Sequence, residues 1–189
     1  MIEILLGTDR PDSKSSAIAA VVHGLFKTQG VASQVLDLRS VMVGLQQGAQ
    51  YGDVKNPVLV EALDRILKSK GMVIVVPEYN GSYPGALKYF IDHWKYPDSF
   101  EFRPIAFIGL GGRFGGLRPV EHLQQVFGYR NAHIYPERVF IMNVWDHFKK
   151  TDSNPEGRFI EPNHMVLLER QARGFAKFVD EIATGRSQK

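Results

Sequence analysis

The sequence predicts a single α/β domain over residues 1–189, with five parallel strands in one sheet and helices on both of its faces. Apolar runs alternate with helix-like patterns along the chain, which is the order expected of successive strand–helix–strand units. The run "GMVIVV" (71–76) is continuously apolar, as a strand buried on both faces should be. The chain has 189 residues, 44% of them hydrophobic, so it can bury a full core without disulfides.

Five segments have the pattern of strands. The first, "IEILLG", is a short buried run, and the second, "ASQVLDL", alternates apolar and polar residues. The fifth contains Pro136 and is expected at an edge of the sheet, because proline cannot donate a hydrogen bond to a neighbouring strand. In chain order the predicted strands cover residues 2–7, 32–38, 71–76, 104–110 and 133–142.

A helix is expected after each strand, because apolar residues recur there with helical spacing. Pro84 lies near the first turn of the third helix, a position that proline favours. The predicted helices cover residues 14–29, 57–69, 84–95, 117–127 and about 162–184. Two long polar segments, 39–56 and 144–161, are predicted to be loops on the surface.

Three predicted strands end in unusual residues, and in an open parallel sheet ligands bind beyond such carboxyl ends. The first of these loops, "GTDRPDSKSS" (7–16), lacks the G-x-G-x-x-G of a dinucleotide-binding turn. Its hydroxyls, its guanidinium and the free amides at the start of a helix suit a terminal phosphate monoester. The candidate phosphate ligands are Thr8, Arg10, Ser13, Ser15 and Ser16. An ordinary helix cap at Asp12 or Ser13 is the alternative, and it accounts for only one or two of these residues.

The second loop, "PEYNGSYPG" (77–85), offers a flat surface to a planar ligand. Tyr79 can lie against a ring, while Glu78, Asn80 and the backbone near Pro77 can hydrogen-bond to its edge. The alternative is a simple turn, since Asn-Gly is a common turn pair.

The third loop, "GLGGRFGG" (109–116), lets a ligand approach the backbone closely, and the amides of Gly111 and Gly112 are candidates for contacts around the ring. As a lone motif this loop is weak. Taken together, a phosphate at one end and a planar, hydrogen-bonding ring at the other describe FMN.

These motifs resemble those of the NADPH-dependent FMN reductase family, flavodoxin-like enzymes that include quinone, azo-dye and chromate reductases. The resemblance covers nearly the whole chain, to about residue 180, and its second motif is highly specific. The family pattern G-S-x-R-x-x-S-x-N is matched by Gly7, Thr8, Arg10 and Ser13, and G-G-x-R is matched by Gly115, Gly116 and Arg118. The pattern P-E-Y-N-x-S-x-P-G-x-L-K is matched by Pro77, Glu78, Tyr79, Asn80, Ser82, Pro84, Gly85, Leu87 and Lys88.

The resemblance implies a flavodoxin-like three-layer sandwich with strand order 2-1-3-4-5 and an FMN-dependent NAD(P)H oxidoreductase activity. It also implies that the nicotinamide passes a hydride to flavin N5 and leaves, after which a small-molecule acceptor collects the electrons in a ping-pong scheme. The flavin carries the chemistry, so no separate catalytic side chain is expected. The acceptor is left open among quinones, azo compounds, metal oxyanions and free flavins. NADPH or NADH is also open, since Arg113 and Arg118 are either contacts for a 2′-phosphate or surface charges.

Three positions depart from the family pattern. Thr8 replaces a serine, Ser15 replaces an asparagine, and Leu110 follows the fourth strand where the family often has a hydroxyl residue. The departures at Ser15 and Leu110 keep open a flavodoxin-like interaction module that has lost its flavin. An electron-carrier flavodoxin is the other alternative, but such carriers are usually strongly acidic and this chain is basic.

Other functions are disfavoured by composition. The chain has no cysteine, which excludes disulfides and thiolate chemistry, and its six histidines form no metal-binding motif. The net charge is only +3 and the basic residues are scattered, which is typical of a solvated surface rather than of a nucleic-acid footprint. No signal peptide and no apolar span of about 20 residues is present, so we expect a cytoplasmic protein that does not enter a membrane.

Trp94, Tyr96 and Phe100 follow the third predicted helix. They belong either to the core or to a surface that binds a partner, and the resemblance favours the second interpretation. Members of the family usually form dimers through this helix and the next. We therefore expect a homodimer or a homotetramer.

Overall fold

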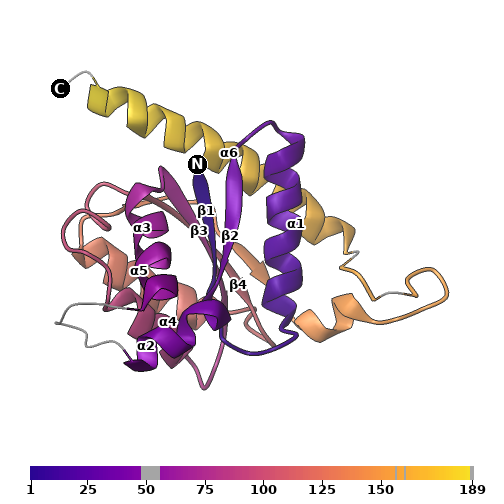
Figure 1. Ribbon diagram of the computed structural model, residues 1–189. Helices are drawn as coiled ribbons and strands as arrows, with labels where there is room; N and C mark the ends of the chain where they lie inside the picture. Colours follow the sequence, from indigo (N-terminus) through magenta and orange to yellow (C-terminus); the bar gives the residue numbers. More distant parts are fainter. Residues whose placement is uncertain (48–55, 156, 160, 188–189) are drawn as a thin grey trace.

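The computed structural model describes residues 1–47, 56–155, 157–159 and 161–187, and its middle layer is a parallel sheet (Figure 1). The strands are β1 (Ile2–Leu6), β2 (Ser33–Asp37), β3 (Gly71–Pro77), β4 (Pro104–Leu110), β5 (His133–Ile134) and β6 (Val139–Ile141). Their order is β2-β1-β3-β4-β5, with β6 also paired to β4, and every pairing is parallel. This confirms the predicted sheet and its strand order.

Helices cover both faces of the sheet, which completes the three predicted layers (Figure 1). The described helices are α1 (Lys14–Thr28), α2 (Met42–Gln47), α3 (Pro57–Lys68), α4 (Gly85–Ile91), α5 (Leu117–Tyr129) and α6 (Pro162–Ser187). Successive residues of a strand point to opposite faces. Accordingly, Ile4 packs with the buried residues of α1 and α6, whereas Leu5 packs with those of α3, α4 and α5.

The segment predicted as a loop over 39–56 begins with regular structure instead. A short helix η1 (Leu38–Val41) leads directly into α2. The Asp37 side chain caps η1 by accepting a hydrogen bond from the Arg39 amide at 3.0 Å, and Leu38, Val41 and Leu45 are buried. Their helical spacing is the signal that the glycine and glutamine content of the segment obscured; residues 48–55 lie outside the described part of the chain.

The predicted fifth strand, 133–142, is two short strands separated by the turn that contains Pro136. Both halves pair with β4 at the edge of the sheet, as expected from the proline. The predicted helix 84–95 ends at Ile91, because the next amides, those of His93 and Trp94, bond to carbonyls three residues back, at Phe90 and Ile91, and the chain tightens into turns. The predicted loop 144–161 begins with a short helix, η2 (Val144–Phe148).

Trp94 and Phe100 are both 5% exposed and belong to the core, where their rings lie 5.7 and 6.1 Å from that of Phe127. The interpretation of these two residues as a partner surface is therefore wrong, because the aromatic packing between α4 and α5 buries them. Tyr96, in contrast, is 57% exposed and remains on the surface, near Tyr129 and Arg130.

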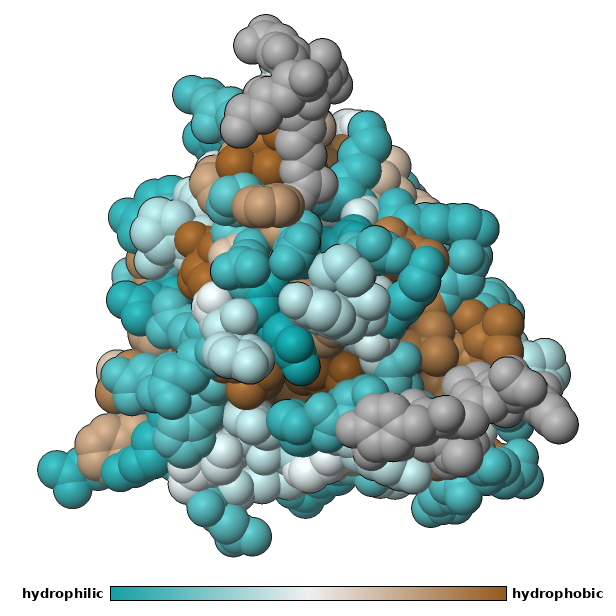
Figure 2. Space-filling view, turned by 90° about the vertical axis from the view of Figure 1, so that its left-hand side faces the viewer, coloured by the Kyte–Doolittle hydropathy of each residue, from teal (hydrophilic) through white to brown (hydrophobic). Residues whose placement is uncertain are grey.

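The side of the molecule that carries α3 and α5 is mostly hydrophilic, with apolar side chains gathered in separate patches (Figure 2). Within the described ranges, no helix combines the length and the apolar character that a membrane crossing requires.

Candidate functional site

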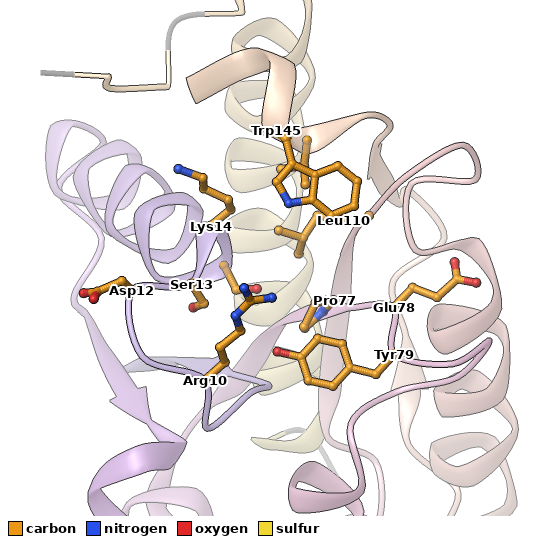
Figure 3. Close-up of a pocket in the computed structure, with 12 residues that line it drawn as sticks. Arg10, Asp12, Ser13, Lys14, Pro77, Glu78, Tyr79, Leu110 and Trp145 are labelled. Atoms are coloured by element: carbon orange, nitrogen blue, oxygen red, sulfur yellow. The ribbon is translucent and has the colours of Figure 1, made fainter. Parts of the chain in front are cut away.

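A pocket of about 230 Å³ lies at the carboxyl ends of β1, β3 and β4 (Figure 3). The strand order reverses between β1 and β3, which is where an open α/β sheet forms a crevice for ligands. Residues of all three predicted loops meet there. Those that line the pocket are Arg10, Ser13, Ser15, Pro77, Glu78, Tyr79 and Gly111, joined by Asp12, Lys14, Leu110, Val144 and Trp145.

The first loop ends in the capped start of α1. The Ser13 hydroxyl accepts a hydrogen bond from the Ser16 amide at 3.2 Å, and the Ser16 hydroxyl donates to the Ser13 carbonyl at 2.6 Å. The capping interpretation is thus correct for Ser13, and the Ser16 hydroxyl is used within the helix. The amides of Lys14 and Ser15, in the first turn of α1, have no partner inside the helix and remain available to an anion at the pocket.

Arg10 supplies the positive charge of this end of the pocket. Its side chain makes no hydrogen bond or ion pair with any other described residue, and Figure 3 shows the guanidinium reaching into the pocket toward Ser13. Asp12 points away from it in the same view. Lys14 also lines the pocket, but its ammonium lies 4.7 Å from the centre of the Phe148 ring and points away from Arg10 in Figure 3. A guanidinium, a helix N-terminus and hydroxyls suit a phosphate monoester.

Tyr79 is a wall of the pocket whose orientation is fixed from both sides. Its hydroxyl lies 2.7 Å from the hydroxyl of Thr8, which is fully buried behind it and does not line the pocket. Its backbone exchanges two hydrogen bonds with Ser82, at 2.8 and 3.0 Å. The turn between them has positive φ at Asn80 (49°) and Gly81 (82°), as a tight Asn-Gly turn requires. Asn80 is exposed and lies outside the pocket lining, as the turn interpretation expects.

The third loop meets the pocket through its backbone. The Gly111 amide donates to the Ile141 carbonyl at 3.2 Å, so this amide is engaged within the protein. Gly112 lies against the indole of Trp145 rather than in the pocket lining: a β-carbon added to it would be 3.6 Å from the ring. The side chain of Leu110 makes an apolar surface between the loops.

Glu78 and Arg118 connect the second loop with the start of α5. Their side chains form an ion pair at 2.9 Å, and the Arg118 guanidinium also lies 4.4 Å from the centre of the Phe114 ring. The Glu78 carboxylate points away from the middle of the pocket in Figure 3. Arg113 lies near the same phenylalanine ring, 5.6 Å from its centre. Of the two arginines considered for a 2′-phosphate, Arg118 is therefore already paired.

The residue of this pocket that sequence reasoning missed most completely is Trp145. It lies in the polar segment predicted as a loop, within η2, and its side chain is 59% exposed at the pocket. An isolated tryptophan in an otherwise polar segment is the signal that could have indicated it, because tryptophan is enriched at binding surfaces relative to the rest of a protein surface.

A histidine of η2, His147, packs against a histidine of α6, His164. The rings of His147 and His164 are 4.8 Å apart, and the His147 ring nitrogen Nδ1 lies 3.7 Å from a carboxylate oxygen of Glu161. His164 Nδ1 is buried without a hydrogen-bond partner. Burial and the neighbouring His147 lower the pKa of His164, against smaller raising effects of Glu161 and of a hydrogen bond to the Phe140 backbone.

This lowered pKa predicts that the protein loses stability in mild acid. The unfolded chain binds a proton at the ordinary histidine pKa of about 6.5, whereas the folded chain resists protonation of His164. The contribution of His164 to the free energy of unfolding is therefore fully present above about pH 6.5 and is lost as the pH falls below that value. Urea denaturation between pH 5 and 8 checks this. The free energy of unfolding should depend less on pH in His164→Phe than in the parent, and an equal pH dependence of the two proteins would contradict the assignment.

The fold and the pocket together define a class: flavodoxin-like α/β proteins with an anion-binding end and an aromatic end at the switch point of the sheet. The family model for NADPH-dependent FMN reductase matches residues 1–146, and the chain belongs to that family. Membership confirms the resemblance, the oxidoreductase class and the expected FMN and NAD(P)H. The residues present also fit FMN, since its phosphate suits the Arg10 end and its ring suits the Tyr79 end.

Individual relatives agree with this assignment. An FMN-dependent NADPH-azoreductase of Staphylococcus aureus (strain USA300) is 29% identical over 128 residues, which is 65% of this chain and 66% of that protein. The chain thus spans about two thirds of the length of this curated relative. Among solved structures, the flavoenzyme NAD(P)H:(acceptor) oxidoreductase FerB from Paracoccus denitrificans has a TM-score of 0.71 at 19% identity, over 95% of this chain and 97% of that one. An apo NADH:FMN oxidoreductase, EMOB, has a TM-score of 0.68 at 17% identity, over 92% and 87%.

Proposed function

We propose that this chain holds FMN in the pocket at the ends of β1, β3 and β4 and reduces a small planar acceptor with electrons from NAD(P)H. The observation that carries the proposal is the division of one pocket into two ends. Arg10 and the start of α1 make a cationic, hydrogen-bonding end, while Tyr79 and Leu110 make an aromatic and apolar end. A molecule with a phosphate at one end and a planar ring at the other is complementary to both.

The residues of the pocket would bind and orient the cofactor. Arg10 and the amides of Lys14 and Ser15 would hold the phosphate, and Tyr79, fixed by Thr8, would hold the ring. When bound, FMN supplies the electron-transfer chemistry. No side chain is assigned a proton transfer, because Glu78, the acidic residue nearest the ring end, is paired with Arg118 and points away from the pocket.

The proposal includes a ping-pong scheme, in which NAD(P)H leaves before the acceptor enters, because the family resemblance implies that both substrates use the same bound flavin. With the FMN-reconstituted protein, initial rates measured against NADPH at several acceptor concentrations should give parallel double-reciprocal lines. Lines that intersect would show that both substrates bind together and would refute the scheme.

An azo dye is the first acceptor to test, because a curated relative is named as an azoreductase, and a quinone is the second. In the presence of FMN and either acceptor, the protein should oxidise NADPH faster than free FMN does. When the pocket is blocked, the rate should fall to that of free FMN. An electron-carrier role is disfavoured by the basic pI of about 9.1, since a net positive charge does not favour docking on a basic redox partner.

We also propose a homodimer or homotetramer. A groove of about 520 Å³ lies between α4 and α5, and two tyrosines that line it, Tyr96 and Tyr129, are 57% and 79% exposed. Exposed tyrosines and an arginine such as Arg130 are enriched at interfaces between proteins. Light scattering should give at least twice the chain mass of 21.3 kDa. Monomer mass across a wide concentration range would reject the assembly without affecting the flavin site.

A further inference from the structure

A histidine of α5 contacts the second loop outside the pocket, and the proposed function leaves this contact without a role. We infer that His122 is a positioning residue of the flavin site, which holds the turn at residues 79–82 through Ser82 so that Tyr79 faces the pocket. The inference rests on the proposed function. Because His122 does not line the pocket, it would act on a bound flavin only through this turn.

The turn depends on side chains for its position, because its backbone does not connect it to the sheet. The Glu78 amide donates to the Leu110 carbonyl at 3.0 Å, at the end of the pairing between β3 and β4. After this bond, the backbone of residues 79–83 bonds only across the turn itself, between Tyr79 and Ser82, within the part of the chain that the structure describes. Contacts of side chains must therefore fix where the turn lies.

α5 supplies two such contacts from one face. The Ser82 hydroxyl lies 2.8 Å from the ring nitrogen Nδ1 of His122. One helical turn earlier, Arg118 forms its 2.9 Å ion pair with Glu78. Residues four apart in a helix are neighbours on its surface, so the same face of α5 holds the chain immediately before Tyr79 and again at the far end of the turn.

The contact at His122 acts on Tyr79 through a single intermediate. Ser82 exchanges both backbone hydrogen bonds of the turn with Tyr79, so a side chain that holds Ser82 also holds the backbone of this pocket wall. A hydroxyl and an imidazole nitrogen can each donate or accept, so the bond forms with either tautomer of the histidine. A loop that is already held in its binding conformation loses less freedom when a ligand binds. Flavin affinity should therefore depend on His122.

Titration of the apoprotein with FMN and with riboflavin tests the inference by binding alone. Loss of one hydrogen bond should weaken both flavins by the same factor, about 2- to 12-fold, in His122→Ala. His122→Asn should recover most of the affinity, because its amide lies as many bonds from the helix as Nδ1 does, whereas restored bulk without a hydrogen-bonding group would not. His23→Ala is the matched control: His23 Nδ1 lies 2.9 Å from the Ser33 hydroxyl, but neither residue lines the pocket, so the affinity should not change.

A double-mutant cycle gives a second readout. Ser82→Ala should weaken both flavins as His122→Ala does, and the double variant should bind no more weakly than either single variant, because all three lack the same bond. Equal flavin affinity in parent and His122→Ala, no recovery in His122→Asn, or losses that add in the double variant overturn the inference and leave the proposed function standing. A parent apoprotein that binds no flavin overturns both.

Discussion

Replacing Arg10 with alanine should weaken FMN binding by about 10- to 150-fold. A hydrogen bond to a charged group contributes about 1.5–3 kcal/mol, and each 1.4 kcal/mol corresponds to about a tenfold change in affinity. Arg10 is suited to this role because its guanidinium reaches into the pocket and is not engaged by any other described side chain. The affinity is measured by titrating the apoprotein and following the loss of flavin fluorescence.

Riboflavin provides the internal control, because it carries the same ring without a phosphate. It should bind Arg10→Ala and the parent almost equally. Arg113→Ala removes an equal charge from the third loop, outside the pocket lining, and should leave FMN affinity nearly unchanged. If Arg10→Ala binds FMN as the parent does, or loses riboflavin to the same extent, Arg10 is not a phosphate ligand. Ser13→Ala is a less clean test, since its hydroxyl also caps α1.

Gly116→Ala should lower the free energy of unfolding by about 2–5 kcal/mol, a large share of the 5–15 kcal/mol typical of a folded domain. Gly116 has φ of +80°, and a β-carbon there would lie 2.5 Å from the backbone nitrogen of Leu110. Both the left-handed conformation and the overlap with rigid backbone oppose the substitution. Because Gly116 also precedes α5 beside Leu110, the variant should lose FMN affinity as well. Urea denaturation measures the effect on stability.

Gly24→Ala is the matched control for this substitution. Gly24 lies inside α1, and no atom lies within 4 Å of the position that a β-carbon would take. Alanine is favoured over glycine within a helix by about 0.5–1 kcal/mol, so this variant should be slightly more stable than the parent. A Gly116→Ala protein as stable as Gly24→Ala would mean that the third loop relaxes freely, and that its glycines do not shape the pocket.

The sequence predicted the sheet and the three loops of the pocket well because their signals are local. A continuous apolar run identifies β3, and "PEYNGSYPG" is unusual enough to indicate a site at its end. The placing of Trp145 depends instead on tertiary packing. Asn143 adopts a left-handed conformation with φ of 46°, and η2 is too short to show helical periodicity. Its position is fixed by the carbonyls of Gly111 and Gly112, which are distant in sequence.

The roles of individual hydroxyls were also beyond sequence reasoning. Thr8, Ser13 and Ser16 are equivalent as potential phosphate donors when only their residue types are known. In the folded chain, Thr8 is buried against Tyr79, while Ser13 and Ser16 bond to each other at the start of α1. The many hydroxyl residues of the first loop thus predicted an anion-binding site. In the folded chain Arg10 supplies the exposed charge, and Thr8, Ser13 and Ser16 make supporting contacts.

The most direct measurement for the central claim is the visible absorbance spectrum of the purified protein, reconstituted with FMN and separated from free flavin, before and after addition of NADPH under argon. We expect about one FMN to remain with each chain and its oxidised absorbance band to disappear when NADPH is added. The band should return when a quinone or an azo dye is admitted. A protein that retains no flavin, or that retains FMN whose spectrum neither NADPH nor NADH changes, would contradict the account.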